Sequence, residues 1–170
     1  MGAGETIFPG VVLTVENMKP ERLVVGVVMA RQPLASKWAS FKWEARGVVA
    51  SDAAAPTQRV LIDDESARQV LFDGCAIELY RDEAEGYYLN LNAPQPKVFV
   101  MWRMHGEEPR PHSVSVSYHE AARLLDAGEQ VDAVAMPAGM ADWVAGFVEQ
   151  HYRPEPKKVR KRDQRVGLNR

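Results

Sequence analysis

The longest apolar run in the chain extends from Leu23 to Ala30, Leu-Val-Val-Gly-Val-Val-Met-Ala. Valine is β-branched and favours a strand, and apolar residues at successive positions are typical of a strand that is covered on both faces. The run is far shorter than the roughly 18 apolar residues that would span a membrane. It therefore predicts the central strand of a sheet.

Other segments also read as strands. The segment Phe41–Arg46 alternates strictly between apolar and charged residues, and Lys97–Met104 alternates in a similar way. The segments Cys75–Arg81 and Tyr87–Asn92 flank an acidic turn and predict a β-hairpin. Shorter strands are expected at Val11–Val15, Ser113–Val116 and Val131–Ala135.

Two amphipathic helices are predicted near the C-terminus. Ser117 and Glu120 have the spacing of a capping box, and Gly128 supplies the left-handed stop of that helix. Pro137 is tolerated in the first turn of the second helix. An apolar stripe follows it, formed by Met140, Trp143, Val144, Phe147 and Val148. The expected fold is α+β, a mostly antiparallel sheet or partly closed barrel of about six to seven strands with two C-terminal helices.

The chain divides into three parts. Residues 1–21 are rich in Gly and Pro and are expected to be irregular, residues 22–153 to form a single domain, and residues 154–170 to form a disordered tail. The last 14 residues carry a net charge of +6, so residues 1–156 carry −8 of the total −2. The protein is an acidic body with a basic terminus.

The sequence contains one cysteine, Cys75, which cannot form an intramolecular disulfide and which fits a reducing, cytoplasmic environment. Because Cys75 lies in an apolar alternation, we interpret it as a small buried hydrophobic residue.

No residue pattern predicts catalysis, a metal or a cofactor. His105, His112 and His119 recur every seven residues, but they fall on a strand end, a Pro-rich loop and a helix start, so the regular spacing does not place them on one surface. We interpret them as structural or solvent-exposed histidines. There is no glycine-rich phosphate loop, no Gly-x-Ser-x-Gly elbow and no zinc-ligand spacing. We predict a protein that is not an enzyme.

Two sequence features are not explained by the packing of a hydrophobic core. Trp38, with Arg31 and Pro33, is a candidate docking patch, because aromatic and arginine residues are enriched at the centres of interfaces. The alternative is that Trp38 packs over the sheet edge. The tail is a second candidate partner-binding segment through Lys157, Lys158, Arg160, Lys161 and Arg162; the alternative is a solvated tail that aids solubility.

Several blocks of the sequence, together covering about residues 23–162, resemble an uncharacterised proteobacterial family of unknown function. They are Arg31-x-Pro-Leu-x-x-x-Trp38-x-Ser-x-x-Trp43-Glu44, the segment Arg81–Leu91, the segment from Ser117 to Gly128, and His151–Lys157 with the basic run. Members of that family tend to be encoded beside molybdenum- or tungsten-dependent formate dehydrogenase genes. The resemblance therefore implies a role in maturing or supporting such an enzyme, and it carries no catalytic residues.

Three functions follow as hypotheses. The leading one is a non-enzymatic accessory protein that binds a formate dehydrogenase component or its maturation factors. The alternative is a binder of a pterin or nucleotide, or an enzyme of molybdenum cofactor maturation, with a candidate pocket formed by Arg46, Tyr87, Asn90 and Arg103. The third is a nucleic-acid-binding regulator, which the acidic body and the lack of aromatic residues in the tail disfavour.

Overall fold

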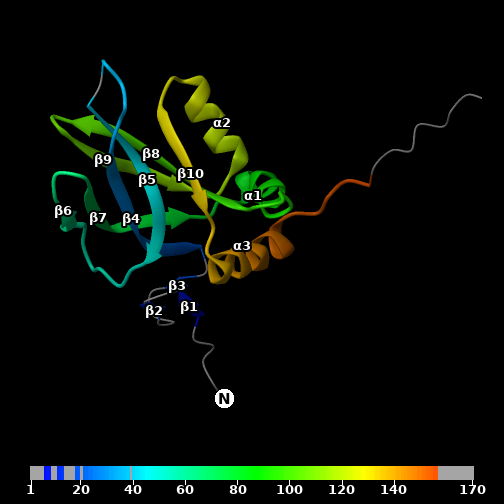
Figure 1. The fold of residues 1–170 in the computed structure, drawn as a ribbon. Coiled ribbons are helices and arrows are strands. Elements are labelled where there is room, and N and C mark those ends of the chain that lie inside the picture. The colour runs from blue at the N-terminus through cyan, green and yellow to red at the C-terminus, as the bar shows by residue number, and fades with distance from the viewer. Residues whose placement is uncertain (1–5, 9–10, 14–17, 20, 39, 157–170) are drawn as a thin grey trace, which may run out of the picture.

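The computed structural model describes residues 6–8, 11–13, 18–19, 21–38 and 40–156 (Figure 1). Most of the predicted tail therefore lies outside the described residues, as does most of the N-terminal segment. The described part of that segment contains the short ribbon of β1 (Thr6–Phe8) and β2 (Val11–Leu13).

The larger sheet has five strands and is built around β4 (Arg22–Pro33). Antiparallel ladders join β4 to β5 (Phe41–Ala50) on one side and to β7 (Arg68–Glu78) on the other. β6 (Thr57–Asp63) pairs with the far side of β7, and β3 (Met18–Lys19) pairs with the start of β4. The valine-rich run is therefore central, as predicted.

The smaller sheet has three antiparallel strands in the order β10 (Gln130–Ala135), β8 (Lys97–His105) and β9 (Glu108–Ser115). It packs against the larger sheet, with β7 beside β9 and β5 beside β10. The shared core contains inward residues of β4 and β8, among them Val25, Val27, Val98 and Val100.

One carboxylate fastens the two sheets together. Asp132 of β10 accepts a hydrogen bond from the Ala45 backbone N–H and another from the Trp102 indole N–H, both at 2.8 Å. Within the described residues no backbone ladder joins the sheets. The α+β, mostly antiparallel prediction is confirmed, and the strands form two sheets that do not close into a barrel.

Three helices gather on one side of the sheets, where two were predicted (Figure 1). The additional helix is α1 (Ala84–Leu91), which follows a short 3-10 turn at Arg81–Glu83. The predicted strand Tyr87–Asn92 was therefore wrong. Ala84, Tyr87 and Asn90 recur every three residues and are all buried, which is the spacing of one helix face.

The helix α2 (Tyr118–Asp126) begins as predicted, since the Ser117 hydroxyl accepts a hydrogen bond from the Glu120 backbone N–H at 3.2 Å. In a capping box the Glu120 carboxylate would also accept directly from the Ser117 backbone N–H. Here that second contact is indirect. The Ser117 backbone N–H donates to the Ser115 hydroxyl, which in turn donates to the Glu120 carboxylate, so Ser115 relays the contact. Gly128 adopts φ 81°, which confirms the left-handed stop.

The helix α3 (Ala138–His151) also agrees with the prediction. It buries Met140, Val144, Phe147 and Val148 against the core, and Trp143 is half-buried at the edge of the same stripe. Pro137 stands directly before its first residue.

The hairpin partner of β7 was also predicted wrongly, because β7 begins at Arg68 and pairs with β6. The β6–β7 turn is held by Asp64, whose carboxylate accepts from the backbone N–H groups of Ser66 and Ala67, each at 2.8 Å. β9 likewise begins earlier than predicted, at Glu108, and includes Pro109 and Pro111. An edge strand tolerates proline because its outer N–H groups need no ladder partner.

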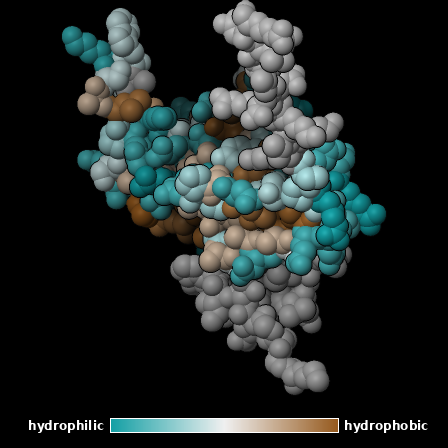
Figure 2. Space-filling view, turned by 90° about the vertical axis from the view of Figure 1, so that its right-hand side faces the viewer, coloured by the Kyte–Doolittle hydropathy of each residue, from teal (hydrophilic) through white to brown (hydrophobic). Residues whose placement is uncertain are grey.

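Figure 2 views the helix side of the molecule, where polar and apolar residues are interspersed. The exposed apolar side chains of the helices include Leu89 of α1 and Leu125 of α2. Among the described helices, none has the length and apolar character needed to cross a membrane.

Candidate protein-interaction site

The loop between β4 and β5 holds the most exposed tryptophan of the described residues. We call residues 34–40 the tryptophan loop, of which Ala39 lies outside the described residues. The Leu34 backbone N–H donates to the Ser40 carbonyl at 3.0 Å and closes the loop, and the Trp38 backbone N–H donates to the Ser36 hydroxyl at 3.2 Å. With this backbone, the Trp38 side chain is 95 % exposed. The interpretation of Trp38 as packing over the sheet edge does not hold.

Arg31 supports the stem of this hairpin. Its guanidinium carbon lies 4.4 Å from the centroid of the Phe41 ring and 5.9 Å from that of Trp43, both on β5. Such cation–π contacts hold the two strands together just below the loop. Arg31 Nε is buried without a hydrogen-bond partner among the described residues. Arg31 therefore acts on the patch by stiffening its base, whereas Trp38 and Pro33 are exposed.

The loop and its stem combine apolar and cationic groups. Leu34 is 40 % exposed and Phe41 is 45 % exposed, and both flank Trp38 in sequence. Lys37 and Lys42 are exposed beside them, and the sequence has no Asp or Glu between residues 31 and 43. This arrangement suits a partner that offers an apolar pocket with acidic groups at its rim. The five basic tail residues predicted as partner-binding, Lys157 to Arg162, lie outside the described residues.

The four residues of the alternative pocket occupy separate places. Arg46 is exposed at an irregularity of the β4–β5 ladder and contacts Glu44. Arg103, on β8, is exposed and forms an ion pair with Glu129. The other two, Tyr87 and Asn90, are buried in α1.

Tyr87 and Asn90 have structural partners. The Tyr87 hydroxyl accepts from the Tyr80 backbone N–H at 2.9 Å. Burial raises the pKa of Tyr87 to about 12, although this hydrogen bond opposes the shift. The Asn90 amide donates to the carbonyls of Lys97 and Val116 and accepts from the Lys97 backbone N–H, at 2.7, 2.8 and 2.9 Å. These hydrogen bonds therefore connect α1 to the start of β8 and to Val116, which directly follows β9.

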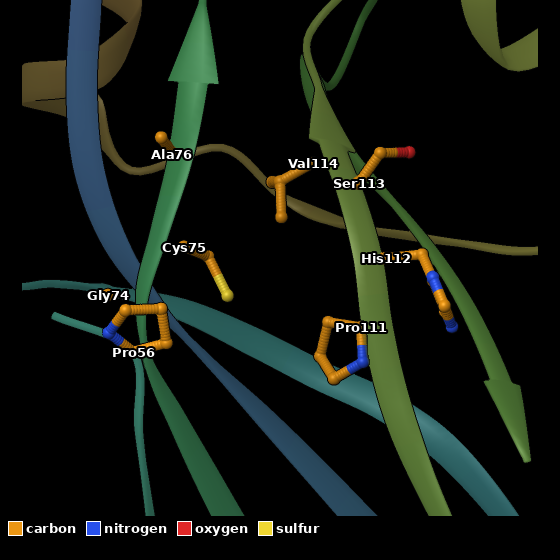
Figure 3. Close-up of a pocket in the computed structure, with 8 residues that line it drawn as sticks. All are labelled: Pro56, Gly74, Cys75, Ala76, Pro111, His112, Ser113 and Val114. Carbon is orange, nitrogen blue, oxygen red and sulfur yellow. The ribbon is translucent and has the colours of Figure 1, made fainter. Parts of the chain in front are cut away.

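A cavity of ≈ 230 Å³ lies elsewhere, between β7 and β9 (Figure 3). The Cys75 sulfur points into it from β7, and Pro111 and Val114 line it from β9, whereas the His112 ring points away. Burial, aided by the Asp73 carboxylate, raises the pKa of Cys75 to about 11. The thiol is therefore protonated at neutral pH and is a poor nucleophile, in keeping with its interpretation as a small hydrophobic residue, although it is half-buried.

A polar cluster that the sequence did not predict joins the two helices α1 and α2. We call it the α1–α2 junction and define it by Glu83, Gly86, Ser115, Ser117 and Glu120. The buried Ser117 hydroxyl donates to Glu83 at 2.5 Å, and Arg123 forms an ion pair with the same carboxylate. Burial raises the pKa of Glu83, but the hydrogen bonds from Ser117 and Arg123 lower it by more, so the net pKa lies below the usual value. The contact between Ser117 and Glu83 had no sequence signal, because the two residues are far apart in the chain.

The structure brings His105 and His112 together, although their spacing in the sequence did not place them on one surface. Their rings stack, with the two Nε2 atoms 3.0 Å apart. The predicted loop that was to hold His112 is part of β9, which pairs with β8 and so brings the two side chains together.

The fold and this site define a two-sheet α+β domain with an exposed tryptophan on the loop between β4 and β5. The family described as "Protein of unknown function (DUF3305)" matches residues 24–162. The chain belongs to this family. No curated protein and no solved structure matches it.

Proposed function

We propose that this chain is a non-enzymatic accessory protein that binds a component of a molybdenum- or tungsten-dependent formate dehydrogenase, or one of its maturation factors. We further propose that the tryptophan loop makes the central contact. The observation that carries the proposal is Trp38, 95 % exposed on a loop that is closed by its own backbone. The choice of partner rests on the family resemblance of the sequence blocks.

The energetics support a docking role for this loop. Burying a tryptophan removes roughly 150–250 Å² from water, which corresponds to about 4–6 kcal/mol at about 25 cal/mol/Å². The loop is already closed and its stem is held by Arg31, so little backbone ordering opposes binding. Such residues are typical of interface hot spots, where truncation weakens binding by about 2 kcal/mol or more.

The basic tail has a different role in this proposal. Its +6 charge would attract an acidic partner from a distance and raise the association rate, an effect that salt screens. The loop would then supply the short-range contact that sets the dissociation rate.

The test is capture from cells that express the dehydrogenase, with the bound subunits identified by mass spectrometry. Wild type should recover a dehydrogenase subunit or maturation factor, and Trp38→Ala should recover at least about tenfold less. Leu125→Ala is the matched control, because Leu125 is also exposed, at 56 %, but lies on α2. Equal capture by Trp38→Ala would contradict the role of the loop, and no dehydrogenase component with wild type would contradict the proposed partner.

Deleting residues 157–170 tests the tail separately. We expect the shortened chain to unfold cooperatively with an unchanged midpoint, and to capture its partner less well at low salt. The difference from wild type should shrink as salt rises, since screening removes the contribution of the tail. Loss of cooperative thermal unfolding would show instead that the tail belongs to the fold.

A further inference from the structure

Two histidines meet on the β8–β9 hairpin of the three-stranded sheet. His105 ends β8 and His112 lies on β9, and both are exposed. Their Nε2 atoms share a hydrogen bond at 3.0 Å, the ring centroids are 5.2 Å apart and the ring planes differ by 23°. The fold therefore brings the two Nε2 atoms into direct contact at the protein surface.

A bulge in the ladder aims one of these side chains. Met101 pairs with Ser113 and Trp102 pairs with Pro111, so His112 is the extra residue on β9. Bulges of this kind redirect a side chain out of the regular alternation. Figure 3 shows the result, because His112 points away from the cavity that its neighbours Pro111 and Val114 line.

We infer that His105 and His112 form a binding site for a divalent transition-metal ion, with their Nε2 atoms as two adjacent ligands. Bonds from such a metal to imidazole nitrogen are about 2.0–2.1 Å long. Two ligands at a right angle then lie about 2.9 Å apart and two tetrahedral ligands about 3.4 Å apart. The observed 3.0 Å matches the right angle of square-planar or octahedral coordination, which Cu²⁺ and Ni²⁺ adopt.

Charges of both signs lie near the two histidines. Arg103 and Arg110 face each other across the same two strands and oppose a positive ion. The Glu129 carboxylate offsets one of them, since it pairs with Arg103 at 3.0 Å.

The site is open. Across the part of the chain that the structure describes, no group of three or more His, Cys, Asp or Glu side chains is placed to hold a metal. Water, or a donor from another molecule, would fill the remaining coordination positions. The affinity order for such a nitrogen site is Cu²⁺ above Ni²⁺ and Zn²⁺. Each ring would offer the lone pair of its Nε2 atom to the ion, in place of the hydrogen bond between the rings.

Copper is the probe of choice for the test. The full chain, without a polyhistidine tag, is titrated with Cu²⁺ near pH 7.5 by calorimetry, and the bound ion is examined by electron paramagnetic resonance. We expect a first site that binds one ion with hyperfine coupling to two imidazole nitrogens. His105→Ala and His112→Ala should each weaken that site at least about tenfold, and the double variant should be little weaker than either single variant, because removing one ligand already breaks the chelate.

Matched controls separate this site from general surface binding. His119→Ala and His151→Ala each remove a histidine that is not part of the pair, and both should leave the first site unchanged. His112→Gln, which keeps a polar side chain at the bulge, should lose the site while keeping the wild-type melting temperature. Copper affinity that survives either pair substitution, or coupling to fewer than two imidazoles, would overturn the inference whatever becomes of the proposed function.

Discussion

The tryptophan loop and the α1–α2 junction use their side chains in opposite ways. At the junction, Ser117 is fully buried and its hydroxyl both donates to Glu83 and accepts from the Glu120 backbone. In the loop, Trp38 exposes nearly all of its surface. Polar groups that are buried and paired hold a fold together, whereas a large apolar group left in water stabilises nothing until it is covered. The comparison separates residues that serve stability from residues available for binding.

The largest expected effect is the loss of Asn90, which fastens α1 to the second sheet beside the junction. Asn90→Ala removes three hydrogen bonds and leaves the Lys97 N–H and the Lys97 and Val116 carbonyls without this partner. We expect the free energy of unfolding to fall by about 3–5 kcal/mol, measured by urea denaturation. Asn92→Ala is the matched control, since that exposed amide makes one hydrogen bond, to the Tyr88 carbonyl. If Asn90→Ala lowered the free energy of unfolding by less than about 1 kcal/mol, Asn90 would not have the structural role that its three hydrogen bonds indicate.

Gly86 gives the next largest effect, because α1 and the start of α2 approach closely there. A Cβ at position 86 would lie 2.2 Å from Ser117 Oγ and 3.4 Å from the His119 backbone nitrogen. Gly86→Ala should therefore destabilise by about 2 kcal/mol or more, although alanine is the better helix former by about 1 kcal/mol.

The control for Gly86→Ala is Gly146→Ala in α3. A Cβ at position 146 would meet no atom within 4 Å, so the helix propensity acts alone. That variant should be more stable than wild type by about 0.5–1 kcal/mol. Equal effects at the two glycines would show that the close approach to Ser117 does not constrain the fold.

The Glu83 carboxylate adds a smaller, pH-dependent effect. Its pKa is lower in the folded chain than in the unfolded chain, because the hydrogen bonds from Ser117 and Arg123 outweigh the opposing effect of burial. Such a group stabilises the fold at pH values above its unfolded pKa, about 4.3, and loses that contribution as the pH falls through the lower folded pKa. The stability difference between wild type and Glu83→Gln should therefore be greatest near neutral pH and shrink below about pH 4. A stability difference that grows as the pH falls would contradict a lowered pKa of Glu83 in the folded chain.

The two regions also differ in how far the sequence could predict them. Trp38 was a candidate because aromatic and arginine residues are enriched at the centres of interfaces, and its exposure leaves it available for such a contact. The capping contact between Ser117 and Glu120 was predicted because it is local. The partners of Asn90 and the contact of Gly86 with Ser117 depend on how distant segments pack, and no local pattern carries that information.

The same limit explains the incorrect strand at Tyr87–Asn92 and the contact between His105 and His112, which the sequence did not predict. Aromatic residues in α1 favoured a strand by propensity, yet tertiary packing selected a helix whose buried face is Ala84, Tyr87 and Asn90. His105 and His112 meet because β8 and β9 pair through a bulge. The sequence did not predict this pairing, because Pro109 and Pro111 of β9 indicated a loop.

The smallest expected change in stability is at Trp38. Trp38→Ala removes a side chain that is 95 % exposed, so the free energy of unfolding should change by no more than about 0.5 kcal/mol. Arg31→Ala offers a contrast within the same hairpin, because it removes the cation–π contacts to Phe41 and Trp43 and should destabilise by about 1 kcal/mol. Urea denaturation measures both. If Trp38→Ala proved as damaging as Asn90→Ala, the indole would have a structural role in solution, and the loop could no longer be treated as free for binding.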